Sequence, residues 1–218
     1  IGRVCGVQVR DEVGSDPGAP ASGALPQGVA LCGSRALGSV WVLEALWERL
    51  GLGRTIRAVA AQSGAPEVLE RALLAMVVNR LCAPESKLGV WDRWLDTVHL
   101  PSCSGLKLRQ MYEAMDLLHT HAAHIEETVF FETANLLNLD VDLVFYDTTT
   151  CSFTIDPPPD GEDDGLRRLG HSKEGTWTAQ VVIALAVTRD GLPVRSWVFP
   201  GNTSDVTTIK RIRDDLRG

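Results

Sequence analysis

The chain lacks any long uninterrupted apolar run. Of its 218 residues 44% are hydrophobic, yet no stretch approaches the ~18 consecutive apolar residues of a membrane span. Its start has no basic segment followed by apolar and small residues, so we predict no signal peptide. It begins at Ile1 rather than at a methionine, which favours an internal fragment.

Cysteines are few and scattered. Five occur, and none forms a C-x-x-C pair. This pattern indicates neither a disulfide framework nor a zinc ribbon. A protein of the reducing cytoplasm is therefore expected.

Basic residues are outnumbered by acidic residues. The chain has 28 acidic against 21 basic residues, a net charge of −7, and phosphate contacts depend on Lys and Arg. The acid is concentrated in residues 156–164, D-P-P-P-D-G-E-D-D, and Arg167, Arg168 and Lys173 follow directly. The net charge therefore does not exclude a local basic surface that binds DNA. For any single basic residue, however, an ordinary solvated surface is the simpler interpretation.

The first 139 residues divide into two parts. Residues 1–34 are rich in Gly, Ala, Pro and Ser without periodicity, which predicts a linker or disordered arm. From residue 35 to 139, apolar residues recur at helical spacing and predict an α-helical domain for DNA-end binding or assembly. The predicted helices cover residues 37–50, 66–81, 86–98, 104–118 and 125–137.

Side chains that contact DNA are hard to find in this helical part. A helix-turn-helix is conceivable over residues 54–81, with Arg71, Asn79 and Arg80 facing DNA, but a basic recognition helix is missing. Base stacking by tryptophans is disfavoured, because their spacing predicts core packing. These tryptophans are Trp41, Trp47, Trp91 and Trp94.

A carboxylate interrupts the first strand-like run of the remaining chain. Residues 141–150 read V-D-L-V-F-Y-D-T-T-T, and the apolar part suits a strand covered on both faces. An Asp in such a run is costly unless it has a partner, and Mg²⁺ is the usual partner where phosphates are handled. Asp147 is therefore a predicted metal ligand, with hydroxyl support from Thr148 and Thr149.

Two more strands and a helix follow. Residues 178–187 and 194–199 are strand-like and are joined by an Asp-Gly hairpin signal. Apolar residues at helical spacing then predict a helix over 206–216 behind a Ser204 cap. Between them, turn formation and capping are the favoured roles of Asn202 and Asp205, ahead of direct substrate contact.

The motifs of this chain together resemble those of the DDE-type insertion-sequence transposases, over roughly residues 35–218. In the second half they read Y-D-T-T at 146–149, G-H-S-K-E at 170–174, D-G-L-P-V-R-S-W-V-F-P-G-N-T-S-D at 190–205 and D-D-L-R-G at 214–218. In the helical part they read L-E-A-L-W-E-R-L-G-L at 43–52, N-R-L-C-A-P-E-S-K-L at 79–88 and Y-E-A-M-D-L-L at 112–118. The resemblance implies a fold of α + α/β class, with an incomplete RNase H-like mixed sheet over residues 140–218.

The same resemblance implies a chemistry and partners. Such enzymes hold Mg²⁺, with Mn²⁺ as a substitute, on three carboxylates and cleave and transfer DNA strands at insertion-sequence ends as homodimers near the nucleoid. Asp147 matches the first carboxylate, and Lys173 lies in a family motif as possible substrate or structural support. The other two carboxylates belong beyond Gly218, so we expect a truncated fragment that is inactive by itself. Residues 175–180 also depart from the family's basic, proline-containing segment.

Two other functional classes stay open. A non-catalytic remnant that binds DNA ends or partner subunits would retain DNA without nicking it. A hydrolase that uses Asp147 with His171 would turn over substrate in the presence of Mg²⁺.

Overall fold

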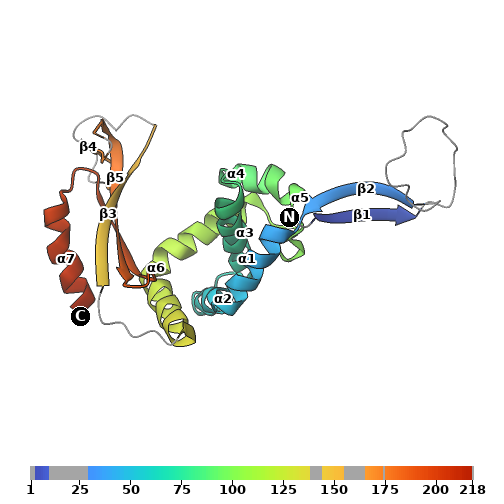
Figure 1. Cartoon of the computed structure of the whole chain (residues 1–218), viewed down its shortest axis with the longest axis horizontal. Coiled ribbons are helices and arrows are strands. Elements are labelled where there is room, and N and C mark those ends of the chain that lie inside the picture. The colour runs from blue at the N-terminus through green and yellow to red at the C-terminus, as the bar shows by residue number, and fades with distance from the viewer. Residues whose placement is uncertain (1–2, 10–28, 138–143, 155–164, 174, 218) are drawn as a thin grey trace. The chain divides into compact units, whose positions relative to one another are not determined.

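The computed structural model describes residues 3–9, 29–137, 144–154, 165–173 and 175–217 (Figure 1). The chain forms two compact units, Ile1–Ile125 and Glu126–Gly218. Their boundary lies inside one helix, α6, rather than between residues 139 and 140 as the sequence suggested. No helix of the described ranges is long and apolar enough to cross a bilayer.

A two-stranded ladder opens the first unit. Strands β1 (Arg3–Val9) and β2 (Val29–Ala36) pair antiparallel, from Arg3↔Ala36 to Val9↔Val29. A linker or disordered arm over residues 1–34 is therefore the wrong description of the paired segments. The prediction was based on the composition of residues 1–34 as a whole, and most of their Gly, Pro and Ser lies in residues 10–28, outside the described residues.

The helices of the first unit are centred on α3, and the last of them, α6, continues into the second unit. In order they are α1 (Gly38–Arg49), α2 (Leu52–Gln62), α3 (Val68–Cys82), α4 (Lys87–Gly89), η1 (Val90–Trp94), α5 (Leu95–Thr97), η2 (Pro101–Cys103) and α6 (Leu108–Leu137). Helices α1 and α2 both pack against α3, whose buried side chains include Leu69, Leu73 and Leu74. The helical domain is thus built on one central helix.

Three details of this unit differ from the sequence prediction. The helices expected over 104–118 and 125–137 merge into α6, which is kinked at His121 (φ −114°, ψ 15°). The helix expected over 86–98 is interrupted by the π-helical turn η1. Core packing is right for Trp47 and Trp94 but wrong for Trp41, which is 64% exposed, and for Trp91, which is also exposed.

The second unit combines an antiparallel sheet with α7 (Asp205–Arg217) and the C-terminal part of α6, from Glu126 onward. The strands are β3 (Val144–Ser152), β4 (Arg168–His171), β5 (Trp177–Thr188) and β6 (Pro193–Pro200). The long β5 pairs with each of the other three strands, always antiparallel. Helices with a sheet confirm the coarse fold class, but the described strands contain no parallel pair of a mixed sheet, and the sequence did not predict β4.

The two faces of this sheet differ. One face packs against α7 through a core formed by Val182, Ala184, Ala186, Trp197, Phe199 and Ile212. On the opposite face Phe145, Leu185 and Val198 are exposed. The expectation that β3 is covered on both faces is therefore wrong for the described part of the chain.

Two glycine-containing turns fix the strand ends. The β5–β6 hairpin has Gly191 at φ +82°, and its N–H donates to Thr188 O at 2.9 Å, which confirms the Asp-Gly hairpin signal. After β6, Gly201 lies so close to the backbones of Gln180 and Arg168 that a Cβ would collide with both carbonyl oxygens. Its carbonyl accepts a hydrogen bond from Gln180 Nε2 at 2.9 Å. This close approach anchors the segment that leads into α7.

Candidate functional site

Asp147 lies in the middle of β3, on the sheet face opposite α7. Because alternate side chains of a strand point to opposite faces, its neighbour Thr148 points toward α7 and is buried. The Asp147 side chain is 91% exposed. Its Oδ1 accepts hydrogen bonds from the Thr148 N–H at 2.8 Å and from Lys173 Nζ at 3.3 Å. The Thr148 amide and then the Lys173 ammonium hold the pKa of the Asp147 carboxyl below its usual value.

Lys173 reaches this carboxylate from the turn between β4 and β5. The turn is closed by the bond from the Ser172 N–H to Thr176 O at 2.8 Å, and Ser172 is buried. Lys173 Nζ also donates to the carbonyl oxygen of Thr148, and its N–H approaches Thr150 Oγ1 at 3.5 Å. The structure thus brings together Asp147 and Lys173, two residues that the sequence analysis named separately.

Asp205 has a different position and different partners. It begins α7, and its Oδ1 accepts a hydrogen bond from Thr148 Oγ1 at 2.7 Å. Its backbone carbonyl accepts from Thr208 Oγ1 at 2.6 Å, and that hydroxyl also bonds to the Tyr146 hydroxyl. These contacts fasten α7 to β3 on the face opposite Asp147. The structure therefore does not bring the two carboxylates together.

The other predicted support residues are exposed. Thr149 lies next to Thr148 on β3 and shares the face of Asp147, as alternation requires. Asn202 is exposed in the turn that follows Gly201. Ser204, the predicted cap, accepts the Thr207 N–H on its carbonyl at 3.1 Å. Of these three residues, Thr149 alone shares the sheet face of Asp147.

A complete metal site is not assembled by the described residues. Among them, no group of three or more His, Cys, Asp or Glu side chains is placed to hold an ion. The acidic run of residues 156–164 lies outside the described ranges. Asp147 therefore belongs to no such group in the described part of the chain.

Arg71, proposed as a DNA contact, is engaged inside the helical unit. Its guanidinium donates to Glu70 Oε1 at 2.7 Å and to Glu48 Oε1 at 2.6 Å, and its side chain is only 19% exposed. Arg80 on the same helix is exposed. This arrangement gives Arg71 a structural role and leaves Arg80 as the better placed of the two for DNA.

The other two candidate arginines precede or begin β4. Arg167 and Arg168 are both half-buried, and Arg168 Nε donates to Gly165 O at 3.2 Å. Their positions place positive charge at the start of β4, in the unit that carries Asp147.

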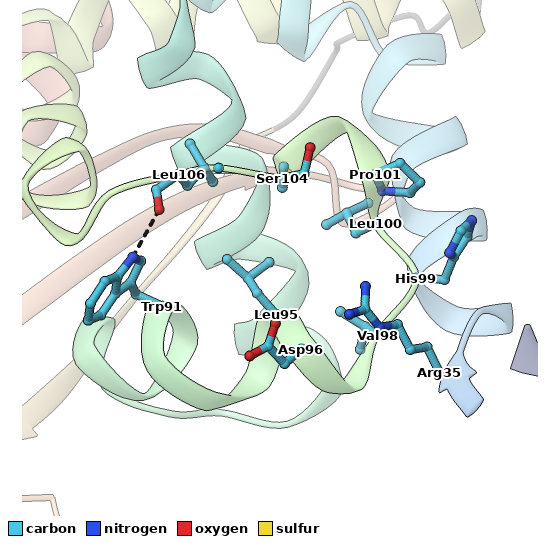
Figure 2. Close-up of a pocket in the computed structure, with 12 residues that line it drawn as sticks. Arg35, Trp91, Leu95, Asp96, Val98, His99, Leu100, Pro101, Ser104 and Leu106 are labelled. Atoms are coloured by element: carbon cyan, nitrogen blue, oxygen red, sulfur yellow. Dashed lines mark hydrogen bonds between the residues drawn. The ribbon is translucent and has the colours of Figure 1, made fainter. Parts of the chain in front are cut away.

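A pocket of about 490 Å³ in the first unit was not foreseen (Figure 2). Trp91 stands at one end, with its indole N–H donating to Leu106 O at 2.9 Å, and Arg35 and His99 stand at the other. Cys103 also lines it, and burial raises the pKa of that thiol to about 11. No sequence signal joins these residues, because they come from separate segments between β2 and α6.

Comparisons with known proteins identify no relatives. No protein-family model matches the chain, and neither a curated protein nor a solved structure matches it. The likeness to transposases therefore depends on the quoted sequence motifs alone.

Proposed function

We propose that the chain is part of a Mg²⁺-dependent DNA transposase, in which Asp147 is one of the carboxylates that hold the metal. The observation that carries the proposal is the exposed Asp147 carboxylate, held in place by a backbone amide and Lys173 in the middle of a strand. The motifs that surround Asp147 and Lys173 in the sequence support the same reaction class.

Structural roles account poorly for Asp147. It belongs to no buried cluster and caps no helix, in contrast to Asp205, which ties α7 to the sheet. The Thr148 amide and the Lys173 ammonium lower the pKa of the Asp147 carboxyl and so favour its ionised form, and metal ligands must be deprotonated. Both hydrogen bonds from the described residues end on Oδ1, so Oδ2 is available for a further ligand.

Asp147 fits Mg²⁺ as one ligand among several. Mg²⁺ is usually held by one or two carboxylates, with waters and substrate phosphates completing the coordination. When bound, such ions polarise the phosphodiester and lower the pKa of the attacking water or 3′-hydroxyl. In this proposal Asp147 holds the metal, and the neighbouring Lys173 ammonium binds a phosphate oxygen of the DNA.

A second candidate function is non-catalytic binding of DNA ends or of a partner subunit. One observation favours it, because Asp147 belongs to no group of three or more His, Cys, Asp or Glu side chains among the described residues. In both proposals the helical unit contacts transposon ends or a second copy of the chain, with exposed Arg80 as the leading contact on α3. Such DNA binding weakens steeply as salt is raised.

The test is strand cleavage at a labelled insertion-sequence end by the complete product of the gene that encodes this chain. With Mg²⁺, Asp147→Asn should abolish cleavage, whereas Asp205→Asn, the matched control, should leave it largely intact. The present chain alone should not cleave DNA, because one carboxylate does not hold two ions ~3.5–4 Å apart. Near-normal cleavage by the complete protein with Asn at 147 would refute the proposal, and DNA retention without any nicking would favour the binding remnant.

A further inference from the structure

An exposed aromatic pair lies at the start of β5. Trp177 begins the strand and is 69% exposed. It pairs directly with His171 of β4, and the two rings meet edge to face, with centroids 5.8 Å apart and an interplanar angle of 84°. An edge-to-face contact occupies the edge of one ring and one face of the other, so the contact itself leaves both faces of the first ring and one face of the second open to a flat partner.

This pair shares a sheet face with Asp147. Directly paired residues of antiparallel strands point to the same side, and side chains alternate along a strand. Asp147 pairs with Leu185, which lies an even number of residues from Trp177 on β5. Trp177, His171 and Asp147 therefore all point away from α7.

Lys173 connects the aromatic pair to the carboxylate. It follows His171 by two residues and places its ammonium 3.3 Å from Asp147 Oδ1. Further positive charge comes from Arg167 near the start of β4. A nucleic-acid strand that contacts Lys173 through a phosphate can extend along this sheet face toward the aromatic pair, whose His171 precedes Lys173 by two residues.

We propose that Trp177 and His171 form a stacking platform for an unpaired base of the DNA strand that is held at Asp147. The proposal deepens the proposed function and rests on it for the identity of the substrate. Bases present their ring faces only when a strand is unpaired, so the platform selects single-stranded over duplex DNA. The acidic composition of the chain limits phosphate attraction, which makes stacking the larger source of affinity at this position.

Fluorescence anisotropy tests the proposal with the present chain, without divalent metal and at low salt. The probes are a labelled single strand of about 12 nucleotides and the duplex of the same sequence. Trp177→Ala should raise the Kd for the single strand roughly 5- to 100-fold. Trp177→Phe should stay within about 3-fold, because a phenyl ring also stacks. Trp41→Ala, the matched control at an equally exposed tryptophan on α1, should bind like the wild type.

A spectroscopic signature separates stacking from a structural role. The single strand should quench part of the tryptophan fluorescence of the wild type, and that part should be missing in Trp177→Phe although this variant still binds. Unchanged single-strand affinity in Trp177→Ala would overturn the proposal. So would an equal loss of duplex binding, or a wild type that binds no single strand.

The outcome is distinguishable from failure of the proposed function. Strand cleavage by the complete protein is measured separately from single-strand binding. A failure of the stacking proposal therefore leaves the test of Asp147 in cleavage undecided. If Trp177→Ala loses single-strand binding but Asp147→Asn still cleaves, the platform stands and the assignment of Asp147 as a metal ligand falls.

Discussion

Arg71→Ala decides whether this arginine is a structural residue or a DNA contact. Arg71 joins α3 to α1 through Glu48 and also bonds to Glu70, the preceding residue of α3. Glu70 is 1% exposed and is also bonded by Trp47 Nε1 at 2.6 Å and approached by Arg57 Nη1 at 3.3 Å. Removing Arg71 leaves a buried carboxylate with fewer donors. We therefore expect a large loss of stability.

The magnitude follows from this burial. Removing one partner of a buried ion pair costs about 3–5 kcal/mol, and the remaining contacts of Glu70 with Trp47 and Arg57 place Arg71→Ala near the lower end of this range. Urea unfolding followed by far-ultraviolet circular dichroism measures the loss. Arg80→Ala, the control on the exposed surface of the same helix, should change the free energy of unfolding by less than about 0.5 kcal/mol.

The pH dependence supplies a second readout. The hydrogen bond from Arg71 lowers the pKa of Glu48 from its usual 4.5. A carboxyl whose folded pKa is depressed stabilises the fold above its unfolded pKa, and this contribution is lost as the pH falls through the folded pKa. The stability difference between wild type and Arg71→Ala should therefore shrink below pH 4.5. If Arg71→Ala instead unfolded like the wild type but lost DNA affinity, the structural role would be refuted.

Three further predictions concern the sheet. Lys173→Met should raise the pKa of Asp147 toward its usual value, measured by NMR titration of the carboxyl carbon, and an unchanged pKa would show that the ion pair does not form in solution. Asp205→Ala removes the acceptor of the Thr148 hydroxyl and should cost about 1 kcal/mol in chemical denaturation; no measurable loss would contradict this anchoring role. Gly201→Ala should lower the melting temperature by several degrees, because its Cβ collides with backbone, and wild-type melting would contradict the close approach.

Local signals in the sequence predicted the second unit well. Apolar strand runs and an Asp-Gly turn predicted β5, β6 and their hairpin, and helical spacing predicted α7. These features depend on residues close together in the chain, such as Gly191, whose positive φ suits glycine. The resemblance directed attention to the segment with Lys173, which lies beside Asp147 in the structure.

Features that depend on distant partners were not predictable. The partners of Arg71 come from α1 and from the preceding residue of α3, and no periodicity marks them. The short β4 lies within a motif with no strand-like run. In the sequence, Trp177 is only one residue of a segment that departs from the family pattern. Its contact with His171, which forms the exposed aromatic pair, is visible only in the structure. The apolar run before Asp147 suggested burial on both faces, yet Phe145 on the face opposite α7 is exposed.

The most direct test of the central claim is divalent-metal binding at Asp147 in the present chain. Mn²⁺ added at low occupancy broadens NMR amide signals near its site, even when binding is weak. We predict broadening of Thr148 and Thr149 that disappears in Asp147→Asn and persists in Asp205→Asn. Broadening confined to the acidic run 156–164, or equal broadening of Thr148 in Asp147→Asn, would contradict the assignment of Asp147 as a metal ligand.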